Sequence, residues 1–150
     1  MKKTVEQRFW EKVGDYSDPI KCWLWTAAST IGHGKQRYGL FWDGERLVQV
    51  HRFSYGMHHH TTIPEGMTID HVKARGCTST LCVNPYHLEA VTIKVNVLRG
   101  DTLAARHLKA THCPQGHPYN KENTYVYLGG RWCRACNKER ARLRRKGLNK

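Results

Sequence analysis

The 150-residue sequence has no long apolar run, and acidic residues are scarce in it. No stretch approaches the length of a membrane span, and the first residues, "MKKTVEQRFWEKV", lack the apolar centre of a signal peptide. We therefore expect no membrane insertion and a cytoplasmic location. Thiols stay reduced in that compartment, so the six cysteines are expected to bind metal rather than to form disulfides.

The shortage of acidic residues leaves the chain strongly basic. Against 12 Asp and Glu there are 25 Lys and Arg, which gives a formal net charge of +13. Residues 1–100 hold 13 basic and 9 acidic residues, whereas residues 101–150 hold 12 and 3. This surplus indicates a polyanionic partner, most simply nucleic acid, held mainly by the last third of the chain. The alternative is a solvated basic tail that only aids solubility.

Hydrophobic residues make up only 39% of the chain, so the core is expected to be modest and to need support from cross-links or metals. Periodicity and turn residues predict a mixture of helices and strands. The expected helices cover residues 4–13, 51–60, 93–100 and the basic C-terminal segment, and the expected strands cover residues 22–29, 67–71, 87–91 and two stretches within 37–50. A tight type I′ turn is predicted at Asp43-Gly44, and Asn84-Pro85 is interpreted as a turn former.

A pattern of metal-ligand spacing occupies the segment that begins at residue 113. A C-x3-H pair and a C-x2-C pair are separated by fifteen residues. Two such pairs joined by a hairpin suit a tetrahedral zinc ion, and "TYVYLGGRW", with Gly129-Gly130 at its tip, supplies the hairpin. His112 is an alternative to His117, which has the better spacing. The expected ligands are Cys113, His117, Cys133 and Cys136.

A helix dense in Lys and Arg is expected directly after this cluster, in "RACNKERARLRRK". Contacts from such a helix to phosphates add affinity that depends on salt and not on base sequence. A further cation, in the pair His51-Arg52, could contact nucleic acid or simply begin a helix. The residues expected to contact nucleic acid are Arg52, Arg134, Lys138, Arg140, Arg142, Arg144 and Arg145.

Three cysteines remain, and they suggest a second zinc site. Cys77 and Cys82 are near neighbours in sequence, and His87 follows at the same interval of five residues. Cys22 would complete a Cys3His set. It is remote in sequence, so this assignment requires the segment "CWLW" to pack beside the loop of residues 77–87. The alternative for Cys22 is a small buried hydrophobic side chain.

The segments "IDH" (69–71), "HLEAVT" (87–92) and "IKVN" (93–96) are expected to form a strand, a second strand and a helix. This order resembles the HNH, or ββα-metal, endonucleases. The spacing C-x4-C-x4-H-x8-N over residues 77–96 is more similar to the His-Cys box homing endonucleases. The whole run of residues 50–100 also looks like phage-type HNH endonucleases. The sequence departs from the His-Cys box in the additional residues "VKARG" before the first cysteine.

The resemblance implies a role for each matching residue. His71 matches the general base, and Asn96 matches the ligand of a single Mg²⁺ or Mn²⁺ ion on the helix. Asp70 stands where many HNH enzymes have a second metal ligand, and Arg37 is a candidate to steady the leaving phosphate. His87 occupies the place of the asparagine that orients the base in simpler HNH proteins. A hydrogen-bonded surface histidine is the alternative for His71.

The resemblance thus implies an α+β fold: a small antiparallel sheet and a zinc-stabilised ββα-metal (HNH, His-Me finger) core, followed by a zinc-ribbon-like hairpin and a basic helix. The nuclease domain is expected over residues 1–100, a linker over 101–112 and the second zinc module over 113–150. The expected activity is metal-dependent cleavage of double-stranded DNA. The resemblance also implies that a phage or mobile element encodes the protein and that it acts in the cytoplasm of a bacterial host cell. Cutting both strands would indicate a homodimer. The alternatives are a non-catalytic, zinc-stabilised DNA-binding regulator and an RNA-directed nuclease.

Overall fold

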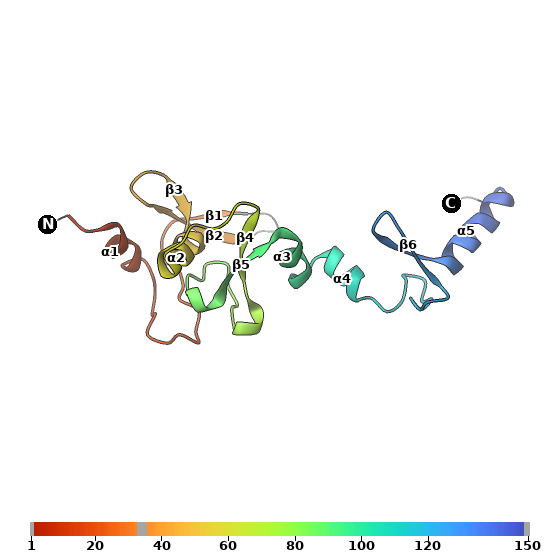
Figure 1. The fold of residues 1–150 in the computed structure, drawn as a ribbon, viewed down its shortest axis with the longest axis horizontal. Coiled ribbons are helices and arrows are strands. Elements are labelled where there is room, and N and C mark those ends of the chain that lie inside the picture. Colours follow the sequence, from red (N-terminus) through yellow and green to blue (C-terminus); the bar gives the residue numbers. More distant parts are fainter. Residues whose placement is uncertain (1, 33–35, 149–150) are drawn as a thin grey trace. The chain divides into compact units, whose positions relative to one another are not determined.

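Two units make up the chain, residues 1–96 and residues 97–150, in the computed structural model, which describes residues 2–32 and 36–148. Figure 1 follows the chain from the first unit to the second. Each unit combines short helices with small antiparallel sheets, so the predicted α+β class is confirmed. Among the helices of the described residues, none has the length and apolar character needed to cross a membrane.

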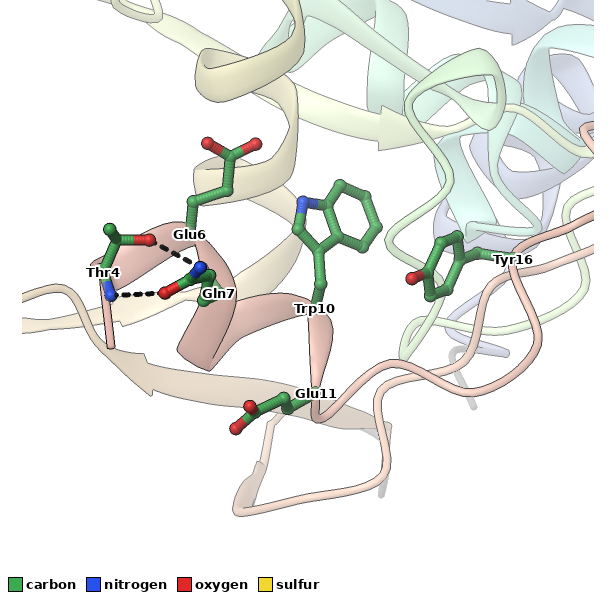
Figure 2. Close-up of a pocket in the computed structure, with 6 residues that line it drawn as sticks. All are labelled: Thr4, Glu6, Gln7, Trp10, Glu11 and Tyr16. Carbon is green, nitrogen blue, oxygen red and sulfur yellow. Dashed lines mark hydrogen bonds between the residues drawn. The ribbon is translucent and has the colours of Figure 1, made fainter. Parts of the chain in front are cut away.

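The first helix, α1 (Val5–Trp10), is shorter than the predicted 4–13 segment. It begins with a capping box, in which the Gln7 N–H donates to Thr4 Oγ1 over 3.1 Å and the Thr4 N–H donates to Gln7 Oε1 over 2.9 Å (Figure 2). Val13 lies beyond the helix and forms an isolated antiparallel bridge with Trp25. The surface pocket of Figure 2 contains none of the predicted site residues and is lined by Thr4, Glu6, Gln7, Trp10, Glu11 and Tyr16.

A three-stranded antiparallel sheet follows, in the order β1 (Ser29–Ile31), β2 (Arg37–Trp42) and β3 (Leu47–Gln49). The tight turn predicted at Asp43-Gly44 is wrong, because Trp42 pairs with Leu47 and the loop spans residues 43–46. The Asp43 carboxylate stabilises this longer loop by accepting the N–H groups of residues 45 and 46, each over 2.9 Å. The strand predicted over residues 22–29 is also largely wrong, since that segment forms only isolated bridges before β1 begins.

The core of the first unit is built from side chains that the sequence spaces far apart. Its buried members are Phe9, Val13, Trp25, Phe41, Val50 and Val83. The Phe9 ring lies at its centre, 5.3 Å from both the Trp25 and the Phe41 ring centroids. Val50 begins α2 (Val50–His59), which matches the helix predicted over 51–60 and packs on β2 and β3. The core therefore joins α1, the sheet and α2 to the loop that carries Cys82.

The segment that resembles the nuclease core forms a hairpin followed directly by a helix. Strand β4 (Met67–His71) pairs in antiparallel register with β5 (Leu88–Thr92), so that His71 lies opposite Leu88. Helix α3 (Ile93–Arg99) begins at the next residue, and the Val95 N–H donates to Thr92 Oγ1 over 3.3 Å, as expected for an N-cap. The predicted order of strand, strand and helix is confirmed. Helix α2 packs against both strands (Figure 1).

The second unit contains α4 (Leu103–Lys109), a hairpin of β6 (Thr124–Tyr127) and β7 (Gly130–Cys133), and α5 (Arg134–Arg145). Helix α4 forms within the segment of residues 101–112 that was expected to be a linker. The predicted hairpin and basic helix are present. Gly129-Gly130 was wrongly placed at the hairpin tip: Tyr127 pairs with Gly130, so the tip residues are Leu128 and Gly129.

Candidate metal centres and the predicted catalytic residues

Four residues of the first unit bring one ligand atom each to a common point. Their sulfur and nitrogen atoms all lie within 4.8 Å of one another, and the set is Cys22, Cys77, Cys82 and His87. His87 Nδ1 is 3.7 Å from the sulfurs of both Cys22 and Cys82. Tetrahedral Zn–S and Zn–N bonds place neighbouring ligand atoms about 3.6–3.8 Å apart, so these residues fit a zinc ion. The predicted Cys3His grouping, including the remote Cys22, is confirmed.

Backbone pairing brings Cys22 to the loop without a regular strand. The Trp25 N–H donates to Leu81 O over 2.9 Å, and the Val83 N–H donates to Trp23 O over 2.8 Å. These two bonds align residues 23–25 with residues 81–83. The Thr78 N–H also donates to Cys22 Sγ over 3.4 Å, a contact that stabilises a thiolate.

Asn84 fixes the same segment from the other side. Its fully buried amide donates from Nδ2 to the carbonyl oxygens of Pro19, at 2.8 Å, and Lys21, at 2.7 Å. Its Oδ1 accepts the Tyr86 N–H over 3.0 Å and so caps the 3₁₀ turn η3 (Pro85–His87). The sequence indicated only a turn former here. Asn84 also holds the chain that leads into Cys22 against the chain that leads into His87.

The sulfurs of this cluster interact strongly with one another. The hydrogen bond that the Cys82 thiol donates to the Cys77 sulfur lowers the pKa of Cys77 to about 4. The same hydrogen bond, together with burial, raises the pKa of Cys82. Cys82 is fully buried and Cys77 is 4% exposed. Two buried sulfurs next to the half-buried Cys22 need a cation before all three can ionise, which is the condition that zinc binding meets.

The second unit contains a second set of four ligand atoms, also within 4.8 Å of one another. It consists of the predicted residues Cys113, His117, Cys133 and Cys136. His117 Nδ1 lies 3.5 Å from Cys113 Sγ and 3.3 Å from Cys136 Sγ, and the two sulfurs are 3.6 Å apart. These separations also suit a tetrahedral zinc ion. His117 is the histidine of this cluster, and His112 instead places its Nδ1 3.0 Å from Thr111 Oγ1.

Neighbouring polar groups support the second cluster as Asn84 supports the first. The side chain of Asn123 donates from Nδ2 to Pro118 O over 2.7 Å and to Cys133 Sγ over 3.3 Å. Burial alone would raise the pKa of Cys133, but the Cys136 N–H and the Asn123 side chain lower it to about 6. A cysteine that ionises this readily is well suited to bind metal at neutral pH.

Arg131 connects this cluster to α4. Its guanidinium donates to the carbonyl oxygens of His107 and Ala110, the latter over 3.1 Å, and lies 4.5 Å from the centroid of the Tyr119 ring. It thereby satisfies carbonyl groups at the C-terminal end of the helix. Sequence reasoning missed this structural role, because a lone arginine in a basic segment gives no sign of it.

The predicted general base, His71, lies beside the first metal cluster. Its Nδ1 is 3.5 Å from Cys77 Sγ. Its other ring nitrogen, Nε2, is buried and has no hydrogen-bond partner within the described part of the chain. A buried polar atom left without a partner is uncommon, and His51 Nδ1 and His87 Nε2 share this condition among the described residues.

His51 packs against His71. From the sequence, the expected roles of His51 are only contact with DNA or the start of a helix. It is 4% exposed, and its ring centroid lies 5.1 Å from that of His71 and 5.6 Å from that of Tyr38. Burial, with smaller contributions from the charges of His71 and Arg52, lowers the pKa of His51 to about 3. His51 is therefore neutral at physiological pH. Nothing in its local sequence distinguishes it from the exposed histidines at the end of the same helix.

The remaining predicted catalytic residues also belong to the first unit. Asp70 precedes His71 in β4 and is 8% exposed, and Asn96 is the fourth residue of α3 and is half-buried. Arg37 begins β2 with an exposed side chain, and its carbonyl accepts the Thr80 hydroxyl over 2.5 Å. The β4–β5–α3 segment thus carries both oxygen donors that the resemblance assigns to a divalent cation.

The predicted nucleic-acid contacts are mainly on the exposed surface of α5. Spacings of four, eight and eleven residues place four cations on one face of this helix: Arg134, Lys138, Arg142 and Arg145. Arg142 is paired with Glu139 through two bonds of 2.8 Å, and these raise the pKa of the guanidinium. Arg140 and Arg144 lie on other faces, and Arg52 is half-buried in α2.

Comparison with known proteins gives no family for this chain: no protein-family model, no curated protein and no solved structure matches it.

Proposed function

We propose that this chain is a zinc-stabilised, metal-dependent endonuclease of the HNH type that hydrolyses phosphodiester bonds in double-stranded DNA. The observation that carries the proposal is the environment of the His71 ring, which has one nitrogen against the first metal cluster and the other without a partner. One nitrogen of the ring contacts Cys77 Sγ, while the buried Nε2 has no partner among the described residues. The buried nitrogens His51 Nδ1 and His87 Nε2 also have no partner among the described residues, and His71 differs from both in its place directly after Asp70 in β4.

The contact with Cys77 would favour the tautomer of His71 that a general base requires. A metal-bound thiolate can only accept hydrogen bonds, so Nδ1 of His71 would carry the ring proton and donate it toward the sulfur. Nε2 then keeps its lone pair and can accept a proton from water. The zinc cluster would thus orient the base, in addition to holding the loop of residues 72–87.

Asp70 and Asn96 provide the donor atoms for a catalytic cation. Carboxylate and amide oxygens are ligands that Mg²⁺ and Mn²⁺ prefer, and both residues are near the β4–β5 hairpin in sequence. Such an ion, when bound, supplies positive charge to the scissile phosphate and to the departing oxygen. His71 would take the proton from the attacking water, and the exposed side chain of Arg37 would contribute further charge at the phosphate.

The second unit is proposed to anchor the enzyme on DNA. Its zinc cluster fixes the start of α5, and one face of that helix carries the four cations Arg134, Lys138, Arg142 and Arg145. Each cation that contacts a phosphate releases counterions and makes binding more sensitive to salt. The unit therefore supplies affinity, whereas the first unit supplies the chemistry.

The proposal is tested by incubating zinc-loaded protein with supercoiled plasmid, with and without Mg²⁺. We expect nicked or linear DNA only when Mg²⁺ or Mn²⁺ is present. Binding without cleavage in every divalent cation offered would contradict the enzyme and support the DNA-binding regulator. Cleavage of RNA with intact plasmid would instead identify an RNA-directed nuclease.

A further inference from the structure

The hairpin of the second unit ends in a leucine that is favoured neither by the turn nor by the core. Pairing of Tyr127 with Gly130 leaves a two-residue loop, Leu128-Gly129, with φ values of +48° and +74°. Such loops favour Asn or Gly at the first position, because a Cβ is strained at positive φ. The Leu128 side chain is also 89% exposed, so burial within the chain does not offset the strain.

Apolar and aromatic side chains continue from this tip along the hairpin. The register places Tyr125, Tyr127 and Trp132 on one face, since Tyr125 pairs with Trp132 and successive side chains alternate between faces. Tyr127 is 60% exposed and Trp132 is 40% exposed. An exposed apolar surface of this kind, in a unit with a small core, indicates a partner.

The charge next to the hairpin identifies the chemistry of that partner. Asn137 donates to the Tyr125 hydroxyl, and the Arg134 guanidinium lies 5.3 Å from the centroid of the Tyr125 ring. These contacts attach the hairpin to the first turn of α5, where the cationic face of Arg134, Lys138, Arg142 and Arg145 begins. The unit therefore carries an apolar tip at one end of the hairpin and a row of cations that starts beside the Tyr125 end. This combination is complementary to a polyanion with an apolar interior, which is the chemistry of a DNA duplex.

We propose that the β6–β7 hairpin is a wedge that inserts Leu128 between base pairs of duplex DNA from the minor groove, while the cationic face of α5 holds the neighbouring phosphates. Aliphatic side chains inserted in this way unstack a base step and bend the duplex. The inference deepens the proposed function and depends on its assignment of duplex DNA as the ligand. It assigns the second unit a role in deforming the DNA in addition to its electrostatic attachment.

The test measures bending and affinity together, without Mg²⁺, so that no DNA is cut. A mixed-sequence duplex of about 30 base pairs, labelled at its two ends with a fluorescent donor and acceptor, reports bending by energy transfer. The decisive variant is Leu128→Gly, which removes the wedge and suits the positive φ, so that the turn is retained. The matched control is Leu108→Ala, which shortens an exposed leucine of α4 in the same unit.

We expect wild type and Leu108→Ala to bend the duplex. Leu128→Gly should bind about tenfold more weakly with an unchanged salt slope and without bending, because the burial of one leucine is partly offset by unstacking. Equal bending by Leu128→Gly, or binding by wild type with no bending, would overturn the wedge and leave the proposed function intact. Absence of duplex binding by wild type would overturn both. Tighter binding of wild type to single-stranded DNA would replace the wedge with a stacking surface.

Discussion

Asn84 provides a direct way to test how the first metal cluster is held together. The change Asn84→Ala removes a side chain that is fully buried and that makes three hydrogen bonds. Two of them, to Pro19 O and Lys21 O, fix the approach to Cys22, and the third fixes the turn before His87. The variant should therefore lower both the stability of the first unit and its affinity for zinc.

The size of the effect follows from those three bonds. A buried hydrogen bond contributes about 1 kcal/mol net, so the free energy of unfolding should fall by about 3 kcal/mol. Asn84→Asp keeps the acceptor that caps the turn and loses both donors. Its new carboxylate would face two carbonyl oxygens, so at neutral pH we expect a loss at least as large as that of Asn84→Ala.

Denaturant unfolding followed by tryptophan fluorescence is a suitable assay, because four of the five tryptophans lie in the first unit. A colorimetric chelator measures zinc release in parallel, and Asn84→Ala should release one zinc per chain faster than wild type. Asn123→Ala is the matched control, since it removes the corresponding amide of the second unit and should leave the main fluorescence transition unchanged. A loss below about 1 kcal/mol in Asn84→Ala, with unchanged zinc release, would refute this role for Asn84.

Three further predictions concern the metal content, the core and the pH dependence. Elemental analysis should give two zinc per chain in wild type and one in Cys82→Ser or Cys133→Ser; a value of one in wild type would remove one of the two clusters. Gly39→Ala should lower the free energy of unfolding by about 1–3 kcal/mol or more, measured by denaturation, because the added Cβ would lie 2.5 Å from Trp25 Cδ1 in the core. A free energy of unfolding equal to that of wild type would show that the core around Trp25 can rearrange to accept the added methyl group. Because the pKa of His51 falls to about 3 on folding, the unfolded chain binds the extra proton, and stability should drop as the pH falls. From pH 7 to pH 5 this drop is about 2 kcal/mol. In His51→Phe this contribution to the pH dependence should be absent, which denaturation at pH 7 and pH 5 would show. An equal fall in the free energy of unfolding in wild type and His51→Phe would contradict the lowered pKa of His51.

Both metal clusters could be predicted from the sequence, because all their ligands except Cys22 come in groups with short spacings along the chain. The pair Cys133 and Cys136 can bind from a single turn, and Cys113 with His117 likewise. Cys22 was assigned by counting the cysteines that remained, and the structure confirms its place. The hairpin and helix that carry His71 and Asn96 were also predictable, since each segment has a clear hydrophobic pattern and a recognisable cap.

The supports of the clusters could not be predicted, because each depends on contacts between segments distant in sequence. Asn84 donates to a carbonyl 65 residues away, and Arg131 donates to one 24 residues away. The burial of His51 results from the packing of α2 against the β4–β5 hairpin. The segment of residues 22–29 has the composition of a strand, but it forms only isolated bridges. Composition sets β propensity, whereas tertiary partners decide whether a ladder forms.

The most direct test of the account is the rate at which a single turnover of zinc-loaded protein nicks supercoiled plasmid in Mg²⁺, for wild type and for His71→Ala. His107→Ala, which alters an exposed histidine of α4, serves as the control. Loss of a general base should slow nicking by about 10²–10⁴-fold in His71→Ala, while the control keeps the wild-type rate. Equal rates in wild type and His71→Ala, with both proteins retaining two zinc, would contradict the account.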